Sequence, residues 1–151
     1  MAYQERTTVR SAQRMFAVMA AAMLLFTLTA AAQDLRGKTN VSIGRIDSDG
    51  VIRSRSNDRI GRIDSDGIIR DRSNAPVGRI ESGGVIRDRS NRQIGKIDSG
   101  GVVRDRSNRQ IGKIESNGAV RDRSNAQIGS TGGIKREWAA VVFFFFSEFK
   151  F

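Results

Sequence analysis

Five arginines stand in the same short context, Arg-Ser-Asn, at intervals of 17 residues. They are Arg55, Arg72, Arg89, Arg106 and Arg123. A guanidinium group carries a planar fork of N–H donors that can bind a carboxylate or a phosphate through two hydrogen bonds. Five weak sites of this kind could together bind an acidic glycan or another anionic ligand tightly. The structural alternative is that each arginine pairs with a nearby acid while Ser-Asn forms a turn.

Other kinds of chemistry have few candidate residues. The chain contains no histidine and no cysteine, so it lacks the commonest general base, thiol nucleophiles, disulfides and thiolate metal ligands. The segment 47–50, Asp-Ser-Asp-Gly, is similar to a calcium loop, but its equivalent at 98–101 is Asp-Ser-Gly-Gly and the 12-residue ligand pattern is missing. We therefore expect no enzymatic activity, no cofactor and no metal site.

The net charge of +10 does not by itself indicate nucleic-acid binding. Residues 1–32 account for +2, and in the remainder an aspartate or glutamate lies close to nearly every arginine. Such mixed charge is typical of a solvated, ion-paired surface. The repeats also lack the aromatic residues on which single-stranded nucleic acids stack. We do not expect a nucleic-acid partner.

The arginines belong to a strict internal repeat. A glycine begins each unit, and the spacing is 17 residues without insertion or deletion: Gly44, Gly61, Gly78, Gly95, Gly112 and Gly129. Seventeen residues suffice for two short strands and two turns, and the aliphatic positions show no helical period. Each unit is therefore predicted to be a β-hairpin that must pack on its neighbours, because it cannot bury its apolar face alone.

The first turn of each hairpin is marked by Asp-Gly, Gly-Gly or Asn-Gly. The glycines that supply its positive φ are Gly50, Gly67, Gly84, Gly101 and Gly118. A three-residue loop at 48–50 pairs Ile46 with Ile52 and Gly44 with Ser54 on one face. Acid and base can then pair diagonally on the other face. That face carries Arg45, Asp47, Val51 and Arg53.

The second turn of each unit contains Ser-Asn. Asparagine tolerates left-handed backbone, so this turn is predicted to link consecutive hairpins. Its asparagines are Asn57, Asn74, Asn91, Asn108 and Asn125. Because an open stack of hairpins would expose two sheet edges, we predict that the units close into a ring. A linear β-solenoid is the alternative.

The N-terminus has the features of a cleavable secretion signal. Arg6, Arg10 and Arg14 precede an uncharged apolar run at 15–32, and Ala30 and Ala32 have the spacing of a cleavage site. Cleavage after Ala32 would export the protein to the periplasm or the medium, and without cysteine it cannot be a lipoprotein. A retained membrane anchor is the alternative, since about 18 apolar residues can just span a bilayer.

The C-terminal segment differs from the repeats. Ala139–Phe146 is an unbroken apolar run with two valines and four phenylalanines, which predicts a strand buried on both faces. Because residues 43–133 contain no aromatic side chain, we expect this strand to seal the ring. The alternative is an exposed phenylalanine strand that drives self-association or membrane contact.

The repeat pattern Ile-Gly-x-Ile-x-x-x-Gly-x-Val-x-x-x-Ser-Asn and the tail Gly-Ile-Lys-Arg-Glu-Trp-Ala-Ala-Val-Val-Phe-Phe-Phe-Phe at 133–146 resemble the five-fold β-flower family of secreted proteins from Bacteroides-type bacteria. The resemblance covers residues 43–146. It implies a small, secreted, five-fold symmetric all-β protein, and it implies no activity, because the function of that family is not established.

These observations predict an all-β protein: a closed five-fold array of 17-residue β-hairpins, a small flower-like toroid with an apolar C-terminal sealing strand. The predicted layout is a signal peptide at 1–32, a lead-in at 33–42, five repeats at 43–128 and a cap strand at 129–151. We expect an exported, non-enzymatic structural or interaction module. The alternative function is multivalent binding of acidic glycans or other anions through the five Arg-Ser-Asn positions.

Overall fold

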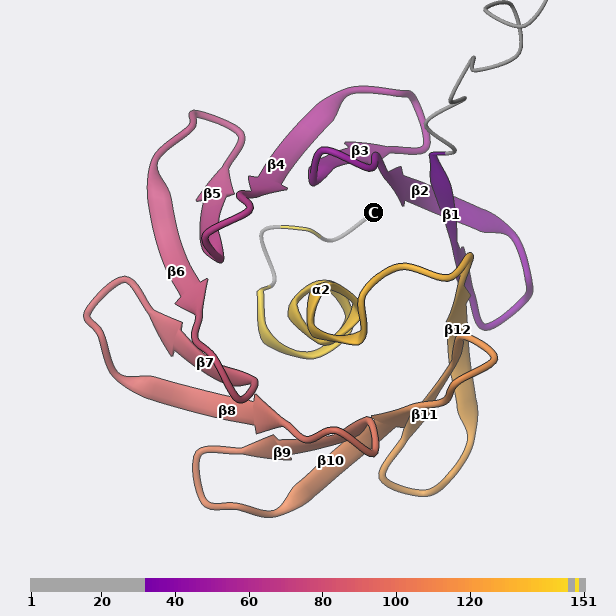
Figure 1. The fold of residues 1–151 in the computed structure, drawn as a ribbon. Helices are drawn as coiled ribbons and strands as arrows, with labels where there is room; N and C mark the ends of the chain where they lie inside the picture. Colours follow the sequence, from indigo (N-terminus) through magenta and orange to yellow (C-terminus); the bar gives the residue numbers. More distant parts are fainter. Residues whose placement is uncertain (1–31, 147–148, 150–151) are drawn as a thin grey trace, which may run out of the picture. The chain divides into compact units, whose positions relative to one another are not determined.

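Twelve antiparallel strands close into one ring-shaped barrel in the computed structural model (Figure 1). The structure describes residues 32–146 and Phe149, so the predicted signal peptide lies outside the described residues except for Ala32. The strands are β1 (Gln33–Gly37), β2 (Ser42–Ile46), β3 (Val51–Ser54), β4 (Arg59–Ile63), β5 (Ile68–Asp71), β6 (Pro76–Ile80), β7 (Val85–Asp88), β8 (Gln93–Ile97), β9 (Val102–Asp105), β10 (Gln110–Ile114), β11 (Ala119–Asp122) and β12 (Gln127–Thr131). Each strand pairs with the next along the chain.

The glycine turn has the predicted register. Gly44 pairs with Ser54 and Ile46 with Ile52. The Asp47 N–H donates to the Val51 carbonyl at 2.9 Å, and the Gly50 N–H donates to the Asp47 carbonyl at 2.9 Å. Gly50 has φ of 86°, which closes a three-residue loop with left-handed backbone at its last position.

The asparagine turn repeats this geometry at the other end of the strands. In the first unit, the Asn57 N–H donates to the Ser54 carbonyl at 2.9 Å and the Ser54 N–H to the Asp58 carbonyl at 2.8 Å. Asn57 has φ of 70°, and Asn40 adopts the same conformation in the β1–β2 turn with φ of 60°. These asparagine turns lie at the periphery of the ring in Figure 1, and we call them the outer turns.

Ring closure depends on the two ends of the repeat region. Strand β1 pairs with β12, with Leu35 opposite Thr131 and Gly37 opposite Gly129. This non-covalent pair reproduces a hairpin, since Thr131 is five repeat lengths beyond Ile46. The five predicted units supply β2 to β11, and half of the predicted lead-in, residues 33–37, forms strand β1 of the barrel. Because closure leaves no sheet edge, the linear solenoid is excluded.

Consecutive hairpins are joined by hydrogen bonds from one unit to the next. The Ile63 N–H donates to the Gly50 carbonyl at 2.9 Å, and the same bond recurs around the ring until the Thr131 N–H meets the Gly118 carbonyl at 2.8 Å. The paired aliphatic residues, such as Ile46 and Ile52, are buried in every unit except for Ile80, which is partly buried. The core therefore lines the inside of the ring.

The C-terminal segment is helical, and the predicted sealing strand is wrong in its secondary structure. Helix α2 (Arg136–Ala140) continues into a π-helix, η1 (Val141–Phe145), and Figure 1 shows α2 inside the ring. A strand there would need an edge to pair with, and the closed sheet offers none. A helix satisfies its own backbone N–H and C=O groups. Its small side chains at Ala139 and Ala140 are fully buried and let the helix fit inside the ring.

The phenylalanines of this segment each pack on a different glycine among those that begin the repeat units. At five of these six glycines, an added Cβ would collide with a phenylalanine ring. The pairs are Phe143 with Gly129, Phe144 with Gly112, Phe145 with Gly95, Phe146 with Gly78, and Phe149 with Gly61. These side chains face the barrel, so they are not the exposed strand that the self-association alternative requires.

Candidate anion-binding turns

The repeat carries two series of arginines with different surroundings. In the first series, each arginine donates Nη1 to the backbone carbonyl of the outer-turn asparagine four residues later, at 3.0 to 3.3 Å. The series consists of Arg53, Arg70, Arg87, Arg104 and Arg121. Most of them also pair with the acid before the glycine turn, as Arg53 does with Asp47 at 2.8 Å and Arg70 with Asp64 at 2.7 Å. These arginines stabilise the hairpin by joining its outer turn to the acid before its glycine turn.

The second series consists of the five arginines singled out in the sequence: Arg55, Arg72, Arg89, Arg106 and Arg123. Each occupies the first position of an outer turn and is exposed. Within residues 32–146, none of these five guanidinium groups makes a hydrogen bond or an ion pair. The expectation that an acid close in sequence neutralises each arginine is therefore not met in this series.

In four of the five units an aspartate precedes the second-series arginine, and its carboxylate accepts hydrogen bonds within its own turn. Asp88 precedes Arg89, but its Oδ1 accepts hydrogen bonds from the backbone N–H groups of Ser90 at 2.8 Å and Arg92 at 3.0 Å. Its Oδ2 lies 2.8 Å from Nη2 of Arg92. The Arg92 backbone N–H, together with its side chain, lowers the pKa of Asp88. Asp88 thus stays ionised as the cap of its own turn, and Arg89 projects beyond it.

A sixth cation completes the set. Lys38 lies 17 residues before Arg55, at the first position of the β1–β2 outer turn, and it is exposed. Sequence reasoning treated residues 33–42 as a lead-in and so missed it. The spacing to Arg55 and the Asn40 two residues later were signals that could have identified it.

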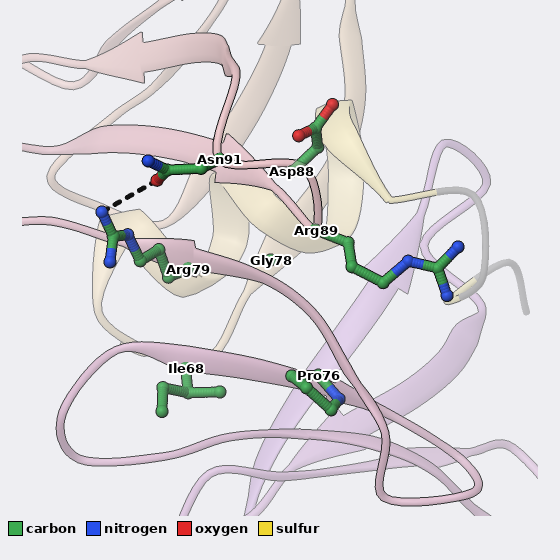
Figure 2. A pocket seen from close by; sticks show the side chains of 7 residues that line it. All are labelled: Ile68, Pro76, Gly78, Arg79, Asp88, Arg89 and Asn91. Carbon is green, nitrogen blue, oxygen red and sulfur yellow. Dashed lines mark hydrogen bonds between the residues drawn. The ribbon is translucent and has the colours of Figure 1, made fainter.

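Two of the second-series arginines, Arg55 and Arg89, line grooves between neighbouring units. Figure 2 shows one groove of 310 Å³, in which Nη2 of Arg79 donates to Oδ1 of Asn91 at 2.9 Å while Arg89 points away from that pair. A second groove of 140 Å³ has seven lining residues that each lie 34 positions, or two units, earlier: Asp34, Ser42, Gly44, Arg45, Ser54, Arg55 and Asn57. The groove therefore recurs at equivalent positions two units apart, and in both copies an arginine without a partner among the described residues lies at its wall.

The glycine turns are stabilised by hydrogen bonds from the backbone to side-chain carboxylates. Asp49 accepts a hydrogen bond from the Val51 N–H at 3.2 Å, which stabilises the turn. The ten turn residues named in the sequence, Gly50, Gly67, Gly84, Gly101, Gly118, Asn57, Asn74, Asn91, Asn108 and Asn125, all have positive φ. No group of three or more acids able to hold a metal is present in the part of the chain that the structure describes. Nor does any helix among these residues have the length and apolarity to cross a membrane.

Comparison with known proteins adds one finding to this geometry. The family model described as "5-fold beta-flower protein" matches residues 32–147, which covers the barrel and the helical segment inside it. No curated protein and no solved structure matches the chain.

Proposed function

Because the chain belongs to the family of 5-fold beta-flower proteins, a description that names a fold and no activity, we propose a function from the outer turns. The protein is an exported, non-enzymatic interaction module that binds anionic polymers, such as acidic glycans. Binding uses Arg55, Arg72, Arg89, Arg106 and Arg123 together, with Lys38 as a sixth cation. The five 17-residue units act as equivalent sites around the ring.

One observation carries this proposal: the two arginine series share a hairpin but have opposite environments. Arg87 is held by Glu81 at 2.8 Å and by the Asn91 carbonyl at 3.1 Å. Arg89, two residues later, is exposed and makes no such contact within residues 32–146. An arginine that neither packs nor pairs contributes little to folding, so its presence in all five units favours a role in binding.

The arrangement suits a ligand with many charges. A single exposed guanidinium binds an anion weakly in water, because solvent and salt screen the pair. Cations displayed at the periphery of one rigid ring share an effective concentration, so a polymer that contacts several of them is retained after any one contact breaks. A small monovalent anion has no such advantage.

The proposed location is outside the cytoplasm, in the periplasm or the medium. The basic segment, the apolar run and the Ala30 and Ala32 cleavage motif support it. Polyanionic glycans are accessible to a protein in those compartments. The complete absence of cysteine suits a fold that depends on packing and ring closure for its stability.

The test compares arginine with lysine, since lysine keeps the charge but loses the bidentate fork. Exchange of all five second-series arginines for lysine should weaken binding of polygalacturonate or dextran sulfate at least tenfold, or about 1.4 kcal/mol, in calorimetry at fixed salt. Unchanged affinity in this variant would contradict the proposal.

A matched pair of double variants supplies the control. Arg89→Lys with Arg106→Lys alters two free arginines, whereas Arg92→Lys with Arg109→Lys alters two exposed arginines of the same turns that are paired with Asp88 and Asp105. The first pair should weaken polyanion binding more than the second. Equal effects of the two pairs would contradict the proposal, because they would show that binding does not distinguish second-series arginines from arginines already paired with an aspartate. If the unmodified protein binds neither polyanion, a purely structural role replaces this proposal.

A further inference from the structure

Arg89 borders a second and larger cavity. It has a volume of 490 Å³ and lies beside the end of η1, and its apolar lining residues are Phe145, Phe146, Val77 and Ile94. Arg89 and Arg92 stand at its polar border. The cavity therefore places four apolar side chains beside two guanidinium groups and the carboxylates of Asp71 and Asp88.

The apolar residues of this cavity have room to accept more contact. Phe145, Val77 and Ile94 are only partly buried, while Phe146 is 7% exposed. Partly exposed aromatic and aliphatic surface around a concave site is the usual setting for an apolar ligand group, because its burial removes further apolar area from water.

The charged groups at the border are not equivalent. Arg92 is paired with Asp88 at 2.8 Å, and Asp71 accepts a hydrogen bond from the Ala75 N–H at 2.9 Å as the cap of its own turn. Arg89 is left as the guanidinium that has no protein partner within the described ranges. It is thus the group that can bind an anion without breaking an existing ion pair.

We infer that this cavity binds an amphiphilic monoanion, an alkyl carboxylate whose head group lies at Arg89 and whose chain lies on Phe145 and Phe146. The inference shares the free state of Arg89 with the proposed function, but its ligand is a small molecule and its affinity depends on apolar contact. A single cavity holds one alkyl chain, so this binding needs no multivalency.

The experiment uses titration calorimetry of the exported protein with butyrate, hexanoate, octanoate and the neutral analogue octanol. Each added methylene should raise the affinity by up to fourfold, the equivalent of about 0.8 kcal/mol per buried CH₂. Arg89→Gln should weaken octanoate binding at least fivefold and leave octanol binding unchanged. Arg106→Gln, at the same position of the next unit, is the matched control and should leave both ligands unaffected. Circular dichroism verifies that each variant is folded.

Three calorimetric outcomes would overturn the inference: an affinity that does not depend on chain length, equal binding of octanol and octanoate, or equal effects of Arg89→Gln and Arg106→Gln. Self-association of the protein that octanoate does not reverse would also overturn it, because a second copy of the chain would then occupy the cavity. Polyanion binding is measured separately on the same variants. Loss of the chain-length effect with retained polyanion binding rejects only this inference, whereas octanoate binding without polyanion binding rejects only the proposed function.

Discussion

The ring of Phe144 occupies the space above Gly112, where the Cβ of any other residue would collide with it and would also approach the Arg121 carbonyl to 2.6 Å. The same contact joins four other phenylalanines to the glycines of other units. As the phenylalanine numbers rise, the glycine numbers fall, so η1 and the residues after it contact the hairpins in reverse order. Two sequence features, the 17-residue glycine repeat and the run of phenylalanines, therefore form one packed layer.

Gly112→Ala should lower the free energy of unfolding by about 1 to 3 kcal/mol, because the added methyl group must displace the Phe144 ring or the backbone. Phe144→Leu should reduce that cost in the double variant, and a double-mutant cycle in urea measures the coupling. Gly100→Ala is the control, since its Cβ would meet only the Asp98 carboxylate, at 3.3 Å. Strict additivity of Gly112→Ala and Phe144→Leu would mean that the glycine does not serve this contact.

The outer-turn asparagines should differ in their tolerance of glycine. Asn108 has φ of 63°, so Asn108→Ala should cost about 1 to 2 kcal/mol, whereas Asn108→Gly should be close to neutral. Asn91→Gly should cost about 1 kcal/mol more than Asn108→Gly, because it also removes the acceptor of the Arg79 hydrogen bond at 2.9 Å. Chemical denaturation measures all three. Similar values for Asn108→Ala and Asn108→Gly would remove backbone strain as the reason for asparagine.

The free energy of unfolding should decrease at acid pH, because carboxylates of the hairpins that are paired in the folded protein become protonated. The side-chain hydrogen bond from Arg87 holds the pKa of Glu81 below its ordinary value. The unfolded chain therefore takes up this proton at a higher pH than the folded protein does. The contribution of Glu81 is complete above the ordinary glutamate pKa of about 4.3 and disappears as the pH falls through the lowered value.

Glu81→Gln should accordingly make the stability less dependent on pH below about pH 5. Arg87→Gln should reduce the same dependence, because it removes the group that lowers the pKa of Glu81. Thermal unfolding between about pH 2.5 and pH 7 provides the comparison. If the stability of either variant depends on pH below about pH 5 as strongly as that of the unmodified protein, the Glu81–Arg87 pair is not the source of this pH dependence.

Ring closure should depend on Leu35. This side chain is fully buried in β1, the strand that pairs with β12 without a covalent turn. Leu35→Ala should cost about 2 to 5 kcal/mol, and the loosened β1 should expose sheet edges that promote self-association. Val41→Ala is the control, since Val41 is 47% exposed and should change stability by less than about 0.5 kcal/mol. Chemical denaturation measures the change in stability, and light scattering measures self-association. A Leu35→Ala protein that stays monomeric with unchanged stability would exclude β1 as the closing element.

Local patterns were enough to predict the hairpins. Asp49-Gly50 specifies a turn through backbone φ alone, and the pairing of Ile46 with Ile52 follows from keeping aliphatic residues on one face. Both features depend on residues that are close in the chain. The outer turns were predicted for the same reason, and so were the candidate arginines, although which of them are free was not evident from the sequence.

The C-terminal segment shows where such reasoning ends. Val141, Val142 and the phenylalanines after them have strand propensity, and no local rule overrides it. The helix forms because the sheet is already closed and the space within it accepts only an element that satisfies its own hydrogen bonds. Likewise, the role of Leu35 in closure depends on its meeting with Thr131, almost a hundred residues away.

The sequence by itself therefore determined the repeat length, both turn types, the strand register and the set of candidate cations, because each of these follows from steric and hydrogen-bonding rules within one unit. The tertiary structure decided three further matters: that the ends of the repeat region close the ring, that the phenylalanines enter it as a helix, and that Arg87 is paired while Arg89 has no partner among the described residues. Each of these depends on which distant atoms share a space, and spacing along the chain does not specify that.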